Sequence, residues 1–481
     1  MTFPKKTALA LATCVVGLAA VHFGVPGKGL SPEVFGEAAQ LRGFWPQPAG
    51  KLDARVPPKL AIPSPVPGGK DGSPAKLAVA RPALADFLFD ESGSLDGFFD
   101  SLRRLETGGG TGHVSVLHYG DSPTTADLIT GDVRSLLQKR FGEAGYGYLL
   151  VAKPWAWYGH RGTDLSDHGW TISTAVGKGR AEAYGLGGAS FVGSAGDASS
   201  HITLKDGAES ALELAYLAQP GGGSVAVMVD GQTIATVDTA SAVRQAGWQK
   251  VTLPAGTKAV DLKVVSGRVE LFGETFSLSQ RGILYDSLGL NGASTTVLSR
   301  GFDTGMWAAE LQHEQPALVI INYGTNESGF GAFVDHQYEG ELRLAIQKIR
   351  NALPNVSILV MSPMDRGERS GIDEIQTMST IPRVVAIQKR VAADTQCAFF
   401  DTFNAMGGDG TMSRWYSGSP RMVAGDLIHP TPQGAAIIAQ IFVKNLMQGY
   451  DGYRGKAASA TVTPAVSVEM PQVQKTPAVQ P

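Results

Sequence analysis

The chain has 481 residues, of which 43% are hydrophobic and 18% are charged, a composition typical of a globular protein with more than one compact unit. Its 41 Lys and Arg residues nearly balance its 44 Asp and Glu residues, giving a net charge of −3. The basic excess that binding to nucleic acid requires is therefore absent. No Cys/His cluster has the spacing of a zinc site, and we expect neither a metal nor another cofactor.

The N-terminus has the pattern of an export signal. Lys5 and Lys6 precede an uncharged apolar run from Thr7 to Val25. This run is longer than most signal peptides and shorter than most membrane-spanning helices, and no small-x-small cleavage site follows it, which favours an uncleaved anchor over a cleaved signal. Residues 1–25 are thus a signal peptide or membrane anchor, and we expect the protein in the periplasm or cell envelope.

Beyond the signal, residues 26–84 are rich in proline and predict an extended or flexible linker. Residues 453–481 at the other end are rich in Ala, Val, Thr and Pro, and predict a disordered tail.

Residues 85–149 and 281–452 alternate between apolar strand patterns and helix patterns. Such alternation predicts an α/β fold, with a parallel sheet covered by helices on both faces. The strands are expected at 114–119, 283–288, 318–323, 357–361 and 398–403, and the helices at 128–141, 342–349, 384–391 and 435–446.

Residues 150–280 have a different texture, with short apolar-alternating segments separated by Gly- and Asp-rich turns. Examples of the turns are Gly221-Gly222-Gly223 and Asp230-Gly231. Short strands at this spacing predict a β-sandwich, inserted after the first helix of the α/β fold.

Four short polar motifs accompany the strands of the predicted sheet. They are Gly120-Asp121-Ser122, a turn containing Gly292, a turn containing Asn326, and the run from Asp426 to His429. Each motif taken singly is more often a helix cap or an ordinary turn. If all four follow strands of one parallel sheet, however, they meet at its carboxyl edge, where a serine hydroxyl, an imidazole base, a carboxylate and oxyanion donors would form an acyl-transfer site.

The four motifs, in this order, resemble those of the SGNH, or GDSL, hydrolases. The resemblance spans roughly residues 112–150 and 281–450 and implies a flavodoxin-like three-layer fold. It implies that Ser122 is the nucleophile, His429 the base and Asp426 the partner that orients the base. It also implies an oxyanion hole made by the backbone N–H groups of Ser122 and Gly292 and the side chain of Asn326.

Three features narrow the resemblance: the variant GDSPTTAD around Ser122, the run Tyr323–Glu327, and the inserted sandwich. Together they are similar to bacterial peptidoglycan O-acetylesterases, which carry a carbohydrate-binding-like insert. Pro123 departs from the residue type expected in some relatives, which bears on the substrate more than on the triad.

Four further side chains are candidates for binding substrate. Trp155, Trp157 and Tyr158 could stack on sugar faces, or could pack between sheet and insert. Arg366 follows the strand at 357–361 and could contact substrate, or could lie in a solvated loop.

The expected function is that of an exported serine esterase that removes O-acetyl or other short acyl groups from an O-acylated polysaccharide of the cell envelope or exterior. Three alternatives stay open: an acetyltransferase that uses the same site, a GDSL-type lipase or thioesterase, and a glycan-binding scaffold without activity. The sequence names neither the polymer nor the acyl group.

Overall fold

The computed structural model describes residues 87–109, 112–177, 181, 183–371 and 374–461. The predicted signal or anchor at 1–25, the linker at 26–84 and most of the predicted tail lie outside these residues. No helix within the described part of the chain is both long enough and apolar enough to cross a membrane.

A six-stranded sheet with the order β1-β19-β16-β15-β2-β14 forms the centre of the α/β part. Five of its strands run parallel to their neighbours, as the alternating pattern predicts, whereas the short edge strand β1 pairs antiparallel with β19. The strands are β1 (Leu88–Phe89), β2 (His113–Gly120), β14 (Gly282–Gly289), β15 (Leu318–Asn322), β16 (Ser357–Met361) and β19 (Ala398–Phe400).

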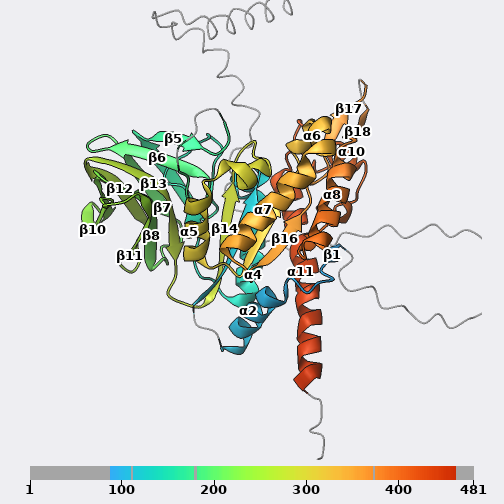
Figure 1. Ribbon diagram of the computed structural model, residues 1–481, viewed down its shortest axis with the longest axis horizontal. Coiled ribbons are helices and arrows are strands. Elements are labelled where there is room, and N and C mark those ends of the chain that lie inside the picture. The colour runs from blue at the N-terminus through green and yellow to red at the C-terminus, as the bar shows by residue number, and fades with distance from the viewer. Residues whose placement is uncertain (1–86, 110–111, 178–180, 182, 372–373, 462–481) are drawn as a thin grey trace, which may run out of the picture. The chain divides into compact units, whose positions relative to one another are not determined.

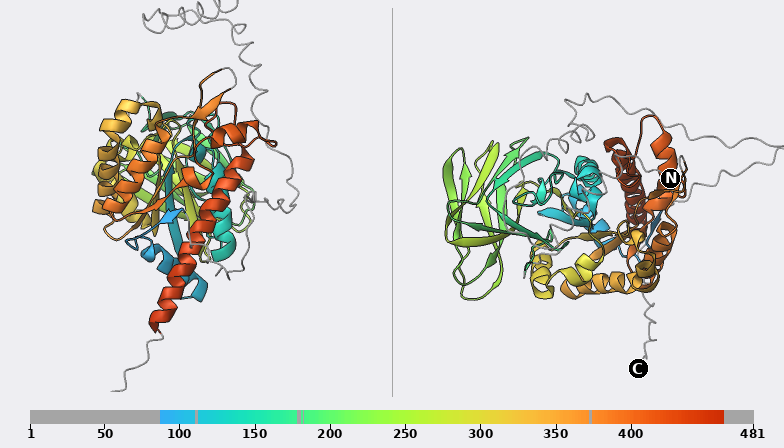
Figure 2. Two further views of the ribbon diagram at one scale, coloured as in Figure 1. Left: turned by 90° about the vertical axis from the view of Figure 1, so that its right-hand side faces the viewer. Right: turned by 90° about the horizontal axis from the view of Figure 1, so that it is seen from above.

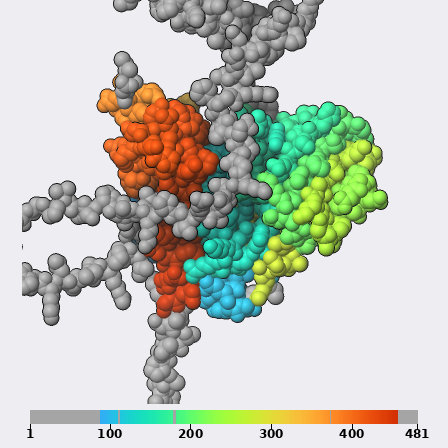
Figure 3. Space-filling model, turned by 180° about the vertical axis from the view of Figure 1, so that it is seen from behind, coloured from blue at the N-terminus to red at the C-terminus, as the bar shows by residue number. Residues whose placement is uncertain are grey.

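Both faces of this sheet are buried. Side chains of successive residues in a strand point to opposite faces, and each face packs in its own apolar cluster. In β2, Val116 packs in one apolar cluster and Leu117 in the other, and Ile358 and Leu359 of β16 divide in the same way. One face is covered by α2 (Asp96–Thr107), α4 (Leu128–Phe141) and α11 (Pro432–Thr461), and the other by α5 (Thr304–Glu314), α7 (Tyr338–Ala352) and α8 (Ile381–Asp394). Figures 1 and 2 show the resulting layers, and Figure 3 shows α11 and α4 side by side on the outer surface.

Two antiparallel sheets lie between β3 (Gly147–Leu149) and β14 in the sequence, and they form the β-sandwich. One has the order β10-β9-β12-β7-β4, and the other has the order β11-β8-β13-β6-β5. The first contains β4 (Thr163–His168), β7 (Ser199–Leu204), β9 (Ser224–Val229), β10 (Gln232–Asp238) and β12 (Ala259–Ser266). The second contains β5 (Thr171–Thr174), β6 (Ala189–Ser194), β8 (Ala211–Ala218), β11 (Gln245–Thr252) and β13 (Arg268–Ser277).

The strand β3 joins the sandwich to the α/β sheet. It pairs antiparallel with β13, while the Tyr148 N–H donates a hydrogen bond of 2.9 Å to Asp286 Oδ1 of β14. Four acidic side chains lie near this junction: Glu274 of β13 pairs with Leu149, Asp286 of β14 accepts the Tyr148 N–H, Glu310 of α5 is close enough for its charge to act on Tyr148, and Glu314 of α5 is close to Asp286 and Glu310. The first three are almost fully buried, and each has a carboxyl oxygen with no hydrogen-bond partner among the described residues.

The structure corrects several details of the predicted elements. The strand expected at 398–403 ends at Phe400, and Thr402 begins the short helix α9 (Thr402–Ala405), with Asp401 as its N-cap. Helix α11 continues to Thr461, past the position where the sequence predicts a disordered tail. The sequence pattern also missed α2, α5, the helices η3 (Val297–Gly301), η4 (Glu327–Gly329), α6 (Gly331–His336) and α10 (Thr411–Ser417), and the hairpin of β17 (Gly367–Arg369) and β18 (Ile375–Thr377).

Candidate active site

Ser122 lies on a tight turn between β2 and α3 (Ser122–Thr125), where its side chain stays partly exposed. The amides of Thr124 and Thr125 both donate to the carbonyl of Asp121, which fixes the turn. Gly120 is required here, because a Cβ at that position would lie 2.1 Å from Thr124 Oγ1. The strand-to-turn geometry therefore presents the serine hydroxyl at the carboxyl edge of the sheet.

His429 and Asp426 meet this hydroxyl in one hydrogen-bonded chain. Ser122 Oγ lies 2.7 Å from His429 Nε2, and His429 Nδ1 lies 2.6 Å from Asp426 Oδ2. The other carboxyl oxygen, Asp426 Oδ1, accepts the backbone N–H groups of Ile428 and His429 at 3.0 and 3.1 Å. A carboxylate held at both oxygens orients the imidazole toward the serine, which is the arrangement that nucleophilic acyl transfer uses.

The sequence pattern predicted that the segment with Asp426 and His429 follows a strand of the sheet. This prediction is wrong. The segment lies in the loop between α10 and α11, which is closed by a β-bridge between Val423 and Pro430 and by a 2.8 Å bond from the Ala424 N–H to the His429 carbonyl. Leu427 adopts a left-handed φ of 62°, which gives the tight turn that brings the two side chains together.

The hydrogen bonds also set the protonation of the pair. Burial opposes ionisation of Asp426, but the hydrogen bonds from the His429 ring and from the two backbone amides lower its pKa to about 2. The hydrogen bond to Asp426 raises the pKa of His429 above the usual imidazole value, against the effect of burial. Asp426 is therefore ionised at neutral pH and makes His429 a stronger base.

Two neighbouring loops carry Gly292 and Asn326. The Leu290 N–H donates to the Gly120 carbonyl, which joins the loop after β14 to the serine turn, and Asn326 Nδ2 donates to the Ala293 carbonyl at 2.8 Å. Gly292 is exposed and has a left-handed φ of 75°, which glycine adopts without strain. A side-chain amide has two N–H groups, so the bond to Ala293 leaves one of those of Asn326 for a substrate oxygen.

Sequence reasoning missed two buried carboxyl groups beside the site. Glu327 accepts hydrogen bonds from the N–H of Thr295 (2.7 Å), the hydroxyl of Thr295 (2.9 Å) and the N–H of Gly324 (3.1 Å). Burial raises the pKa of Asp121 to about 7, and the charge of Glu327 acts in the same direction. The only signal for Glu327 was its place next to Asn326 in the turn after β15.

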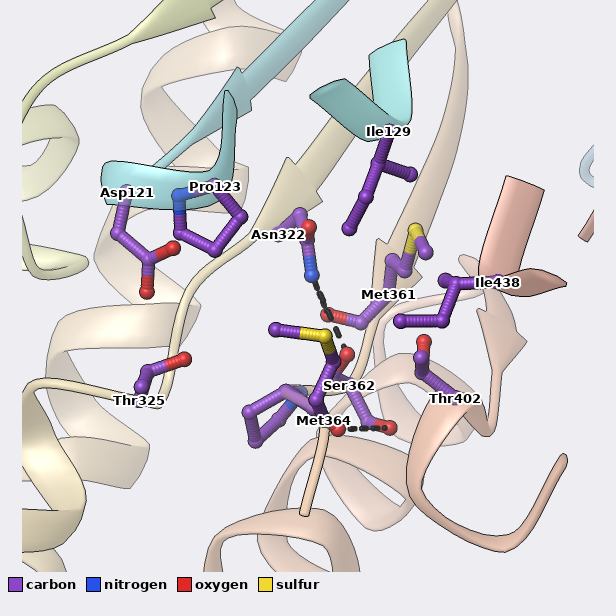
Figure 4. A pocket seen from close by; sticks show the side chains of 11 residues that line it. Asp121, Pro123, Ile129, Asn322, Thr325, Met361, Ser362, Met364, Thr402 and Ile438 are labelled. Atoms are coloured by element: carbon purple, nitrogen blue, oxygen red, sulfur yellow. Dashed lines mark hydrogen bonds between the residues drawn. The ribbon is translucent and has the colours of Figure 1, made fainter. Parts of the chain in front are cut away.

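A small chamber lies behind the serine turn (Figure 4). Asp121 and Pro123 contribute to its wall, but Ser122 is not among its lining residues. The remaining lining residues are Ile129, Asn322, Thr325, Met361, Ser362, Pro363, Met364, Thr402 and Ile438. The residues that line the chamber therefore pack against the serine turn, and Ser122 and His429 lie outside the chamber.

The candidate substrate contacts divide into two groups. Tyr158 is buried, and its hydroxyl accepts the Leu150 N–H at 2.8 Å, so this side chain packs in the core and is unsuited to stacking on a sugar. Trp155 is partly buried against the same core, whereas Trp157 is 42% exposed. Arg366 lies near the site, but its Nη1 donates to the Thr325 carbonyl (2.7 Å) and to Ser328 Oγ (3.2 Å), which holds the loop that carries Asn326.

Within the described residues, no three His, Cys, Asp or Glu side chains are grouped so that they could hold a metal ion. The groups at this site, a hydroxyl, an imidazole, a carboxylate and amide donors, are sufficient by themselves for acyl transfer.

Residues 265–437 match the model of the GDSL-like lipase/acylhydrolase family. This segment of the chain is similar to the SGNH, or GDSL, hydrolases. The match supports the predicted family and the predicted enzyme class, a carboxylic ester hydrolase.

One solved structure with a similar fold covers most of this chain, which confirms the predicted fold class. A peptidoglycan O-acetylesterase is similar at a TM-score of 0.65 and 23% identity, over 76% of this chain and 99% of that one. A salicylyl-acyltransferase from a tetracycline biosynthetic pathway aligns at 0.25 and 16% identity (63% of this chain, 99% of that one), and an acetyl xylan esterase at 0.26 and 17% identity (34% and 80%). No curated protein matches the sequence.

Proposed function

We propose that this hydrolase is an exported esterase that removes O-acetyl groups from a polysaccharide of the cell envelope. The observation that carries the catalytic part is the hydrogen-bonded chain from Ser122 through His429 to Asp426, with contacts of 2.7 and 2.6 Å. These distances lie within the range of a nucleophile and base ready for proton transfer.

The proposed reaction has two steps. His429 takes the proton of Ser122 while the Ser122 oxygen attacks the ester carbonyl, and the developing oxyanion accepts hydrogen bonds from the N–H groups of Ser122 and Gly292 and from Asn326. The tetrahedral intermediate collapses to an acyl-enzyme, and His429 returns its proton to the departing sugar oxygen. Water, deprotonated by His429, then attacks the acyl-enzyme, and His429 returns the proton to the Ser122 oxygen as acetate leaves.

Exposure of the site supports a bulky substrate that carries a small acyl group. The side chains of His429 and Asp426 are 38% and 46% exposed, so the base lies close to the protein surface. An acetyl ester that projects from a polymer can reach such a site without the polymer entering a cavity. The resemblance to a peptidoglycan O-acetylesterase and the apolar N-terminal segment support an acetylated envelope glycan and export.

A panel of O-acetylated polymers tests this substrate class. We expect acetate release from O-acetylated peptidoglycan at a rate well above that from acetyl xylan or from long-chain acyl esters, measured by an enzyme-coupled acetate assay. The Ser122→Ala variant serves as the control for acetate lost without catalysis.

Two results would redirect the proposal. Faster turnover of long-chain esters would point to a lipase or thioesterase. Transfer of the acetyl group to an added acceptor glycan in preference to water would point to an acetyltransferase.

A further inference from the structure

Glu327 forms hydrogen bonds to both loops that carry the proposed oxyanion donors. Its Oε1 accepts the Thr295 N–H at 2.7 Å and the Thr295 hydroxyl at 2.9 Å, and its Oε2 accepts the Gly324 N–H at 3.1 Å. Thr295 lies three residues after Gly292, and Gly324 lies two residues before Asn326. One carboxylate therefore joins the loop after β14 to the loop after β15.

Asn326 makes a second bond across the same two loops, to the Ala293 carbonyl at 2.8 Å. On the far side of the Asn326 loop, Arg366 holds the Thr325 carbonyl at 2.7 Å. Asn326 thus sits between Gly324 and Glu327 in a short turn, which the 3.0 Å bond from the Ser328 N–H to the Gly324 carbonyl closes. Few conformations of this turn are compatible with all of these bonds.

Because Glu327 is buried, the loss of any of these hydrogen bonds would leave a buried polar group without a partner, which destabilises the fold. The residue is only 2% exposed, and all three of its partners are donors, so the bonded geometry suits a carboxylate that only accepts. The hydrogen bonds favour the ionised form, whereas burial raises the pKa of Glu327. Glutamine in its place would keep one oxygen acceptor but would turn an N–H₂ group toward one of the donors.

We propose that Glu327 is a positioning residue that fixes the separation between the Gly292 N–H and the Asn326 amide, and that it acts on catalysis through these donors. The inference rests on the proposed acyl-transfer function of the site. Donors at an oxyanion hole are effective only when they are held close to the place where charge develops. A shift of one loop relative to the other therefore weakens the binding of the transition state more than the binding of the substrate.

The test is a double-mutant cycle between Glu327→Gln and Asn326→Ala, assayed with a chromogenic acetate ester. We expect Glu327→Gln to lower kcat by about 10²-fold and to change KM by less than about threefold, since one well-placed donor is worth about 10²–10³ in rate. In the Asn326→Ala background the same replacement should lower kcat by less than about fivefold, because one of the two donors whose separation Glu327 fixes is already gone.

Two further variants separate positioning from stability. Thr295→Val removes the hydroxyl bond to Glu327 but keeps the Thr295 N–H bond, and should lower kcat by a few fold, so it replaces Glu327→Gln in the cycle if that variant fails to fold. Glu341→Gln is the matched control: Glu341 is also buried and accepts from Ser299 and Arg300 of the neighbouring segment, without touching either donor loop. Its kcat should match that of the wild type.

Equal losses of kcat from Glu327→Gln in the two backgrounds would overturn the proposal, as would a rise in KM with an unchanged kcat. Full activity of Asn326→Ala alone would instead contradict the proposed oxyanion hole itself. The two failures are therefore distinguishable.

Discussion

Replacing His429 with alanine is expected to lower kcat for a small acetate ester by about 10⁶-fold while KM changes by less than about threefold. Without the imidazole, the Ser122 hydroxyl has no base at 2.7 Å to take its proton, and the leaving oxygen has no acid. Asp426→Asn should lower kcat by about 10⁴-fold, because the ring loses the carboxylate that orients it and raises its pKa. Steady-state kinetics measure both effects.

The sandwich offers a matched control for these variants. His201 Nδ1 lies 2.7 Å from Asp261 Oδ1, so this pair has the same contact as His429 and Asp426, while its Nε2 lies 3.5 Å from the Thr203 hydroxyl, far from the site. His201→Ala should leave kcat and KM unchanged. A His429→Ala enzyme that keeps more than about one hundredth of the wild-type kcat would show that another group is the base.

The second large effect concerns the acidic side chains around β3. Burial raises the pKa of Glu274 and Glu310 to about 8 and that of Asp286 to about 7. Glu314 has its pKa raised by the same cause and by its acidic neighbours Asp286 and Glu310. None of the four forms an ion pair with a Lys or Arg of the described residues, so each remains neutral in the fold at a pH where it ionises in the unfolded chain.

The sign of the pH dependence follows from these shifts. Between the unfolded pKa of a glutamate, about 4.5, and the folded value of about 8, the folded protein binds more protons than the unfolded chain. The free energy of unfolding therefore falls as the pH rises through this window. We expect the junction between the sandwich and the α/β sheet to be more stable at pH 5 than at pH 8.

Glu310→Gln tests this directly, because glutamine keeps the shape of the side chain and cannot ionise. At pH 8 the variant should be more stable than the wild type by about 2 kcal/mol, and at pH 5 the two should differ by less than about 0.5 kcal/mol. Denaturant unfolding at both pH values measures the difference. Glu91→Gln, at an exposed position, is the control and should change stability at neither pH.

A gain for Glu310→Gln that is the same at pH 5 and pH 8 would contradict this account. Such a result would mean that packing, and not ionisation, explains the gain.

The sequence was informative where one physical signal dominated. The buried strand β16 and the helix α4 have the predicted bounds, because a run of apolar residues or three- and four-residue spacing leaves little choice. The serine turn was predictable for the same reason: it follows a buried strand and precedes an amphipathic helix.

The remaining features depend on long-range contacts. The turn from Asp426 to His429 takes its shape from the left-handed Leu427 and from the bridge between Val423 and Pro430, and neither has a local sequence signal. Tyr158 looked available for a sugar because it follows two tryptophans, yet the Leu150 N–H and the sandwich core enclose it. The role of Glu327 depends on Thr295, which is 32 positions away in the sequence, so no local pattern could indicate it.

The central claim is that the Ser122 hydroxyl is the nucleophile that receives the acyl group. Incubation of the wild-type protein with a fluorophosphonate, followed by mass spectrometry of its peptides, tests this claim most directly, because the reagent forms a stable adduct with a base-activated serine. The account predicts a single adduct on Ser122 that appears together with loss of esterase activity and that His429→Ala does not form. An inactivated enzyme whose adduct lies on another residue, or an active enzyme with Ser122 fully modified, would contradict it.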